Sequence, residues 1–234
     1  MGKKGEEKTS KKGGCLKPLF FLVFLLIGSL GTGIYFTFVP QDLSDIDGYR
    51  DEPAAIPTAG RDLAAVLRAS RSRLTPATIT EEEINNYLSR TLRLDQGGLT
   101  KGYVTLRGVW VRLEAGHAEV ILERELNVEG FNRRHTVAMH MAFTQTIEPG
   151  TGIATGFNPV GHSASFADRM MEPNAGRFGT VPVVEGYLVL VRDSFVALLD
   201  AYPEIQKSFQ ELLGAGMRVT IEDGRLLIAP PPAS

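Results

Sequence analysis

One short segment of this chain carries residue types that could perform nucleophilic chemistry. Gly161-His162-Ser163-Ala164-Ser165 approaches the Gly-x-Ser-x-Gly turn that exposes a serine nucleophile in hydrolases, with Ser165 in place of the last glycine. That arrangement needs an acid and then a histidine further along the chain, and no histidine follows His162. A hydrolase that uses Ser163 with another order of partners is therefore kept as an alternative. The interpretation that we favour is a flexible loop.

Metal and polyanion chemistry find little support in the residue types. His135 and His140 are five positions apart, so on a strand they point to opposite faces, and the single cysteine, Cys15, lies before the apolar segment near the N-terminus. The basic cluster Arg133-Arg134-His135 is either an anion site or a solvated strand end, and we favour the second. Because the net charge is only −2, no broad basic surface argues for nucleic acid. We predict no catalytic residue, no metal site and no cofactor.

The chain is richer in apolar side chains that share a face. Alternate residues of one predicted strand point the same way, and so do residues at helical spacing in the segment 182–202. The two methionines of the strand could re-pack around varied apolar ligands, although the same residues could form an ordinary core. The candidate ligand-binding residues are Val137, Met139, Met141, Phe143, Tyr187, Val191 and Phe195.

The elements that would position these residues follow from periodicity and capping. A helical pattern begins at Arg61, and Thr80 with Glu83 forms a capping box that starts a second helix. Alternating strands fill residues 100–147, a glycine-rich segment covers 148–180, and a hairpin with an Asp-Gly turn closes the chain. The expected fold is α+β, with an N-terminal transmembrane helix followed by an antiparallel sheet packed against a long amphipathic helix over residues 182–202.

The N-terminal region predicts a membrane anchor. Residues 1–18 are a basic tail, residues 19–39 an uncharged apolar helix, residues 40–60 an acidic linker, and residues 61–234 the domain. Lysines precede the span and are absent immediately after it, so we expect a cytoplasmic N-terminus, an extracytoplasmic domain, and residence in a bacterial inner (cytoplasmic) membrane. A cleaved signal peptide is the alternative, but the apolar run continues past any plausible cleavage site.

Three short motifs carry a resemblance to a known family. They are Ile79-Thr80-Glu81-Glu82-Glu83-Ile84-Asn85, Gly179-Thr180-Val181-Pro182-Val183, and the Asp223-Gly224 hairpin, in this order after a basic tail and a span. The layout resembles the YpmS-like family of membrane-anchored bacterial proteins of unknown function, and is similar in outline to tubular lipid-binding domains of the bacterial envelope. The segment 148–180 departs from that layout. The resemblance implies lipid binding and carries no catalytic residues.

These observations lead to one functional expectation and its alternatives. We expect a non-enzymatic envelope protein that meets the lipid bilayer through Leu19 to Val39 and binds an apolar ligand, with lipid as the candidate. The first alternative is a scaffold or accessory subunit that binds another envelope protein through its sheet edge or its long helix. The second is the serine hydrolase described above.

Overall fold

The computed structural model describes residues 16–51, 60–92, 102–128, 131–143, 157–159 and 175–230. The chain divides into two compact units, unit 1 (Met1–Phe36) and unit 2 (Thr37–Ser234). The helices are α1 (Leu16–Thr37), α2 (Leu63–Arg73), α3 (Glu81–Thr91), α5 (Glu185–Leu188), α6 (Arg192–Asp200) and α7 (Pro203–Gly214). The strands are β1 (Ala77–Thr80), β2 (Val104–Glu114), β3 (His117–Val128), β4 (Phe131–Phe143), β5 (Phe157–Pro159), β6 (Gly176–Phe178), β7 (Val181–Val183), β8 (Arg218–Glu222) and β9 (Arg225–Ala229).

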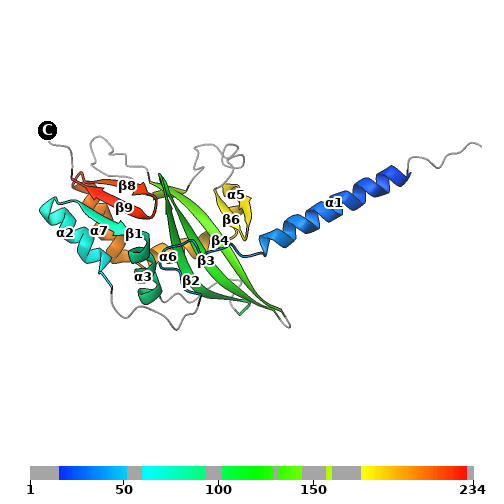
Figure 1. Cartoon of the computed structure of the whole chain (residues 1–234), viewed down its shortest axis with the longest axis horizontal. Coiled ribbons are helices and arrows are strands. Elements are labelled where there is room, and N and C mark those ends of the chain that lie inside the picture. Colours follow the sequence, from blue (N-terminus) through cyan, green and yellow to red (C-terminus); the bar gives the residue numbers. More distant parts are fainter. Residues whose placement is uncertain are drawn as a thin grey trace, which may run out of the picture. The chain divides into compact units, whose positions relative to one another are not determined.

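Unit 1 contains a helix that is long and apolar enough to cross a membrane. Its candidate span, Leu19–Thr37, has 19 residues and a mean hydropathy of 2.2 and forms one continuous helix (Figure 1). The hydroxyl groups within the span are satisfied inside the helix, because Ser29 donates to the Leu26 carbonyl and Thr32 to the Gly28 carbonyl. This agrees with the coarse expectation of an N-terminal apolar helix.

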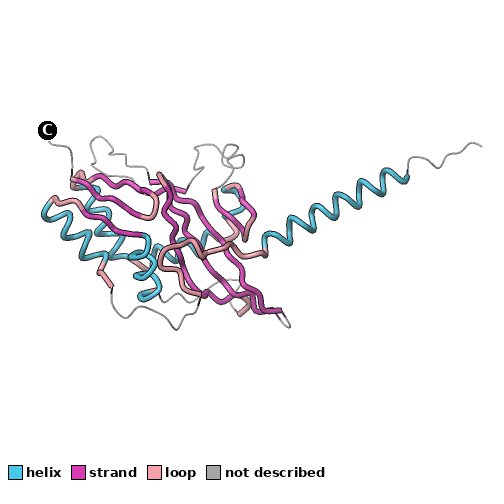
Figure 2. Tube along the Cα trace, in the orientation of Figure 1, coloured by secondary structure: helices cyan, strands magenta, loops and turns pink. Residues whose placement is uncertain are grey.

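Unit 2 combines two antiparallel sheets with helices, which agrees with the α+β prediction. The smaller sheet has the order β1-β9-β8, and the larger one has the order β2-β3-β4-β6-β7 with β5 paired to β4. Figure 2 shows the three long strands β2, β3 and β4 running side by side. The sequence pattern led us to expect one sheet; it missed β1, which pairs with β9 and lies far from it in the chain.

The local signals for helix and turn starts are confirmed. The Thr80 hydroxyl accepts from the Glu83 backbone, and the Glu83 carboxylate accepts from the Thr80 backbone, which completes the capping box. Gly224 has a φ of +70° in the β8–β9 hairpin, a conformation that glycine adopts without steric cost.

The predicted long helix over residues 182–202 is wrong. Pro182 lies in β7, at the edge of the larger sheet, where its missing N–H leaves no ladder bond unmade. The helical part is split into α5 and α6. Between them Leu190 donates to the Tyr187 carbonyl and Val191 to the Leu188 carbonyl, a three-residue spacing that is tighter than an α-helix. The β-branched residues Val189 and Val191 flank this turn and lower the preference for a continuous helix.

The predicted start of the domain at residue 61 also needs correction. Leu43 and Ile46 are each only 4% exposed, and they form a small core with Trp110, Ile121 and Ala138 of the larger sheet. The first part of the expected acidic linker therefore belongs to unit 2, because its two apolar side chains are buried there rather than left in solvent.

Candidate ligand-binding faces of the larger sheet

The larger sheet has two faces, which we name by what covers them. The register places Val109, Leu122 and Val137 opposite one another on the helix face, and Trp110, Ile121 and Ala138 on the linker face. Side chains of α3, α5 and α6 pack on the helix face, and residues 41–49 pack on the linker face. The small sheet, α2 and α7 form a separate core that also includes the strand ends at Leu113 and Ala118.

The seven candidate ligand-binding residues do not form one exposed site. The four from β4 share the helix face, as their spacing predicted. They differ in burial and in the core that they join. Val137, Met139 and Phe195 are buried with Leu188 and Leu198; Met141 and Val191 are half-buried at the edge of the same core; Phe143 is half-buried against the other core; and Tyr187 is exposed. At the buried positions, neighbouring side chains of the protein supply the apolar contacts that the ligand hypothesis assigned to a bound molecule.

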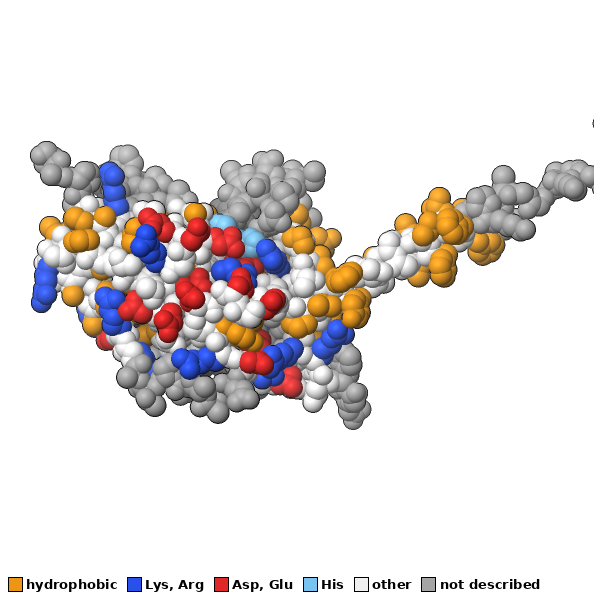
Figure 3. Space-filling view, viewed as in Figure 1, with side chains coloured by type: hydrophobic (Ala, Val, Ile, Leu, Met, Phe, Trp, Pro, Cys, Tyr) orange, Lys and Arg blue, Asp and Glu red, His pale blue; other side chains and the backbone are white. Residues whose placement is uncertain are grey.

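Exposed apolar side chains are concentrated instead along α5 and α6. We call them the α5–α6 apolar set: Tyr187 (57% exposed), Val189 (65%), Leu190 (75%), Val196 (44%) and Leu199 (53%). In the described part of unit 2, only Phe38, Leu74 and Tyr103 are other large hydrophobic side chains with comparable exposure. Figure 3 shows interspersed acidic and basic side chains on the face of unit 2 that is turned to the viewer. Five large apolar side chains are thus exposed within thirteen consecutive positions.

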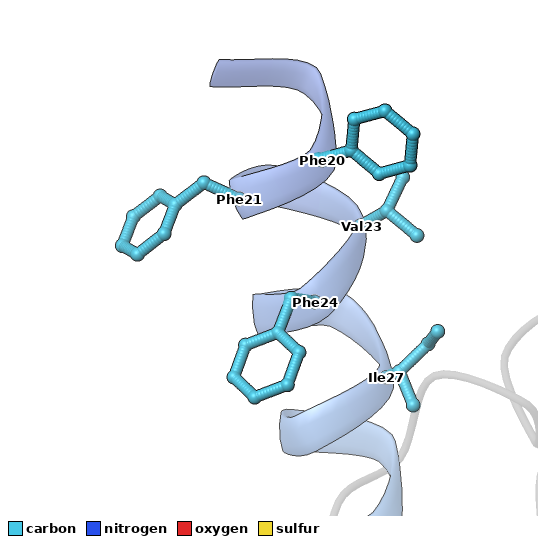
Figure 4. Close-up of a pocket in the computed structure, with 5 residues that line it drawn as sticks. All are labelled: Phe20, Phe21, Val23, Phe24 and Ile27. Atoms are coloured by element: carbon cyan, nitrogen blue, oxygen red, sulfur yellow. The ribbon is translucent and has the colours of Figure 1, made fainter. Parts of the chain in front are cut away.

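Two hollows are formed by described residues. One lies on α1 between Phe20, Phe21, Val23, Phe24 and Ile27, whose side chains project away from the helix axis (Figure 4). Outward-facing apolar side chains of this kind are what a helix presents to lipid. The other is a polar hollow on the surface beside Ala115, Glu222, Asp223 and Arg225. The seven candidate residues line neither hollow.

Polar groups of α3 hold the segment after the span against the linker face and β2. The Asn85 side chain is fully buried, donates to the carbonyls of Asp47 and Val111, and accepts from the Val111 N–H at 2.7 Å. The buried Glu81 carboxylate accepts from the backbone N–H groups of Asp47 (2.8 Å) and Leu113 (2.6 Å). The acidic-Asn motif on which the family resemblance rests therefore has a structural role here: it joins three segments of unit 2.

The linker face buries an extended ionic network around Glu119. The side chain of Glu119 is 2% exposed, pairs with Arg112, and lies 3.2 Å from His140 Nε2 and 3.5 Å from Arg177 Nε. Arg112 also reaches Asp45 at 2.8 Å and so connects the segment after the span to the sheet. Burial raises the pKa of Glu119, but the hydrogen bond with His140 and the charges of Arg112 and Arg177 outweigh it and leave the pKa below its ordinary value. The buried carboxylate is thus ionised and fully compensated.

The helix face buries a charge without such compensation. Arg124 is 8% exposed, and its Nε and Nη2 atoms have no hydrogen-bond partner among the described residues. Burial lowers the pKa of Arg124 to about 10. Its neighbour across the ladder is His135, whose pKa falls to about 4 because of burial and the charge of Arg124, against a hydrogen bond to the Thr37 backbone. A lone buried guanidinium is a group that an anion could satisfy.

The pattern of β3 contained a signal for this site that we did not use. Arg124 interrupts the apolar alternation Ala118, Val120, Leu122, Leu126, so its position on a buried face could be inferred from spacing alone. Of the basic cluster in β4, Arg133 and His135 share the helix face with Arg124, whereas Arg134 lies on the linker face and pairs with Asp51.

The positions considered for hydrolase and metal chemistry are placed only in part. Ser163 and His162 lie outside the described residues. His135 and His140 are on opposite faces of β4, as their spacing predicted, and His140 lies beside His117 with ring centroids 5.6 Å apart. Within the described ranges, no three or more His, Cys, Asp or Glu side chains are grouped so that they could hold a metal ion.

No protein-family model matches this chain, and a comparison with curated proteins found no relative.

Proposed function

We propose that this protein is a non-enzymatic, single-pass protein of the bacterial inner membrane whose extracytoplasmic domain binds lipid at the membrane surface. The N-terminal apolar helix would act as an uncleaved signal-anchor, with the lysine-rich tail in the cytoplasm. The likeness in layout to the YpmS-like family supports the same assignment and suggests no catalytic role.

The observation that carries this proposal is the α5–α6 apolar set. Leu190 and Val189 are 75% and 65% exposed at the turn between two short helices, so they can enter an apolar phase without any part of the core opening. Exposed apolar groups of this kind bind where water can be excluded from them.

A short connection makes lipid the nearest apolar phase. Gln41 is buried in unit 2, and its backbone N–H donates to the Thr136 hydroxyl at 2.9 Å. It lies five positions after Phe36, the last residue of unit 1, so the connection spans at most about 18 Å. A domain held this closely meets the bilayer at a high effective concentration.

The chain has a single native cysteine, Cys15, so one substitution removes it and a new cysteine can then be labelled at a chosen position. In a Cys15→Ser background, Leu190→Cys carries an environment-sensitive fluorophore, and the full chain is reconstituted in bilayers that contain lipids with a spin label on the acyl chain. We expect strong quenching at position 190. The matched control is Ser72→Cys on α2, which is exposed and polar and should remain unquenched.

Two results would count against this function. Equal quenching at positions 190 and 72 would show that the apolar set does not enter lipid. Protection of the label at position 190 by a second envelope protein, without quenching by lipid, would favour the scaffold alternative.

Orientation is tested separately. A reporter that is active only outside the cytoplasm, fused after Ser234, should be active while the protein stays in the membrane fraction. A shortened, soluble, exported product would show instead that the apolar segment is a cleaved signal.

A further inference from the structure

Arg124 is a buried cation on the helix face without a counter-charge. In the described part of unit 2 it takes part in no ion pair, and two of its three guanidinium nitrogens are enclosed without a hydrogen-bond partner. Burying an ionised group costs several kcal/mol unless it is paired. A bound anion would supply the missing counter-charge and hydrogen-bond acceptors.

The carboxylates closest to Arg124 in the chain are directed elsewhere. Glu123 and Glu125 flank it in β3, so they project from the linker face. Glu123 accepts from Trp110 Nε1 at 3.0 Å and lies 3.6 Å from Arg134. The acidic residues next to Arg124 in the sequence therefore do not neutralise it in the fold.

The walls around Arg124 are apolar and basic. Across the two ladders it faces Leu106 on β2 and His135 on β4, and Leu122 and Leu126 are its neighbours on the same face of β3. Arg133 lies diagonally across on β4, on the same face. Apolar walls with basic groups suit a ligand that combines hydrocarbon with an anionic head.

The site lies where the chain enters unit 2. The ring of His135 packs against Phe38 with centroids 5.8 Å apart and hydrogen-bonds the backbone of Thr37. Thr37 is the last residue of the candidate span and the first residue of unit 2, so His135, the ladder neighbour of Arg124, contacts the start of unit 2.

We propose that Arg124 binds the phosphate group of an anionic phospholipid headgroup, an inference that rests on the proposed lipid-binding function for the source of the phosphate. The planar guanidinium can donate two parallel hydrogen bonds to phosphate oxygens, a geometry that an ammonium group does not offer. The half-buried neighbours Leu106 and Leu126 would contact the upper part of the acyl chains.

The experiment follows thermal unfolding of the full chain in nanodiscs. Trp110 is the only tryptophan and is 5% exposed in unit 2, so its fluorescence reports unfolding of this domain. One arm titrates the fraction of phosphatidylglycerol in discs whose other lipid is digalactosyldiacylglycerol, which is neutral and contains no phosphate. The other arm titrates inorganic phosphate into discs of digalactosyldiacylglycerol alone at constant ionic strength. The variants are Arg124→Met and Arg124→Gln, and Arg218→Met on β8 removes an exposed charge as the matched control.

We expect phosphatidylglycerol to raise the melting temperature of the wild type and of Arg218→Met. In the Arg124 variants, half of that rise should require a phosphatidylglycerol fraction at least about tenfold higher than in the wild type. If inorganic phosphate raises the melting temperature of the wild type and phosphatidylglycerol does not, the proposal that a lipid supplies the phosphate is wrong. A response that persists in both Arg124 variants, or no response of the wild type in either arm, would overturn the site.

If one Arg124 variant fails to fold, the other carries the comparison, and the absence of a wild-type response in both arms overturns the site without any variant. Quenching at position 190 is independent of this readout, so failure of the proposed function and failure of the Arg124 site can be told apart.

Discussion

Strand β3 buries charged side chains on both faces of the larger sheet, and the two faces treat them differently. Glu119 on the linker face has Arg112, His140 and Arg177 around it. Arg124, five residues further on and on the helix face, has none of these compensations among the described residues. The two positions have similar burial and lie on one strand, so the difference comes from what the rest of the fold brings to each face.

Glu119 and Arg124 differ in whether contacts inside the protein account for the buried charge. Glu119 is explained completely by contacts inside the protein, since it links the segment after the span, through Arg112, to three strands of the sheet. Arg124 has no internal explanation of that kind. Deleting a compensated charge should therefore cost stability, and deleting an uncompensated one should not.

The largest effect is expected at Glu119. Replacing it by glutamine (Glu119→Gln) leaves two arginines beside an uncharged group, and the free energy of unfolding should fall by about 3–5 kcal/mol. Urea unfolding of the full chain in detergent, followed by Trp110 fluorescence, measures it. Glu114→Gln is the control, because that side chain is 49% exposed. A loss as small as that of the control would show that the network does not stabilise the fold.

The next effect is a pH dependence from His135. Its pKa is about 4 in the folded protein and 6.5 in the unfolded chain, so the unfolded state takes up the proton first as the pH falls. Stability should therefore decrease between pH 6.5 and 4, by about 3 kcal/mol in total.

His135→Gln keeps a hydrogen-bond donor near Thr37 and should flatten this part of the stability profile. Unfolding measured across that pH range in wild type and variant isolates the contribution of His135 from those of the other histidines. An unchanged slope in the variant would contradict the assignment.

Replacing Arg124 should change the free energy of unfolding in the opposite direction to replacing Glu119. In neutral lipid without phosphate, Arg124→Met should leave stability unchanged or raise it by about 1 kcal/mol or more, because an uncompensated charge is replaced by an apolar side chain of similar length. The same variant should raise the pKa of His135, since one cause of its lowering is removed. A clear loss of stability would mean that Arg124 is compensated inside the protein after all.

The smallest effect is expected at the solvent end of the Glu119 network. Asp45 is 62% exposed and pairs with Arg112 at 2.8 Å. Asp45→Asn should cost about 0.2–1 kcal/mol in urea unfolding, and the cost should shrink at high salt. A cost close to that of Glu119→Gln would show that the segment after the span depends on this exposed pair rather than on the buried part of the network.

Local patterns in the sequence determined a good part of this structure. The uncharged run before Pro40 specifies an apolar helix, Thr80 with Glu83 specifies the start of α3, and Asp223-Gly224 specifies the final hairpin. Each depends on residues within a few positions of one another, so spacing alone is informative. Alternation along β4 likewise placed its four candidate residues on one face.

Only the tertiary structure decided what those faces contact. The pairing of β1 with β9, the burial of Leu43 and Ile46, and the break between α5 and α6 depend on segments far apart in the chain or on packing against the sheet. The same holds for the two buried charges. Sequence spacing assigns Glu119 and Arg124 to opposite faces, but whether a buried charge is compensated depends on side chains from other strands, and these become neighbours only when the sheet forms.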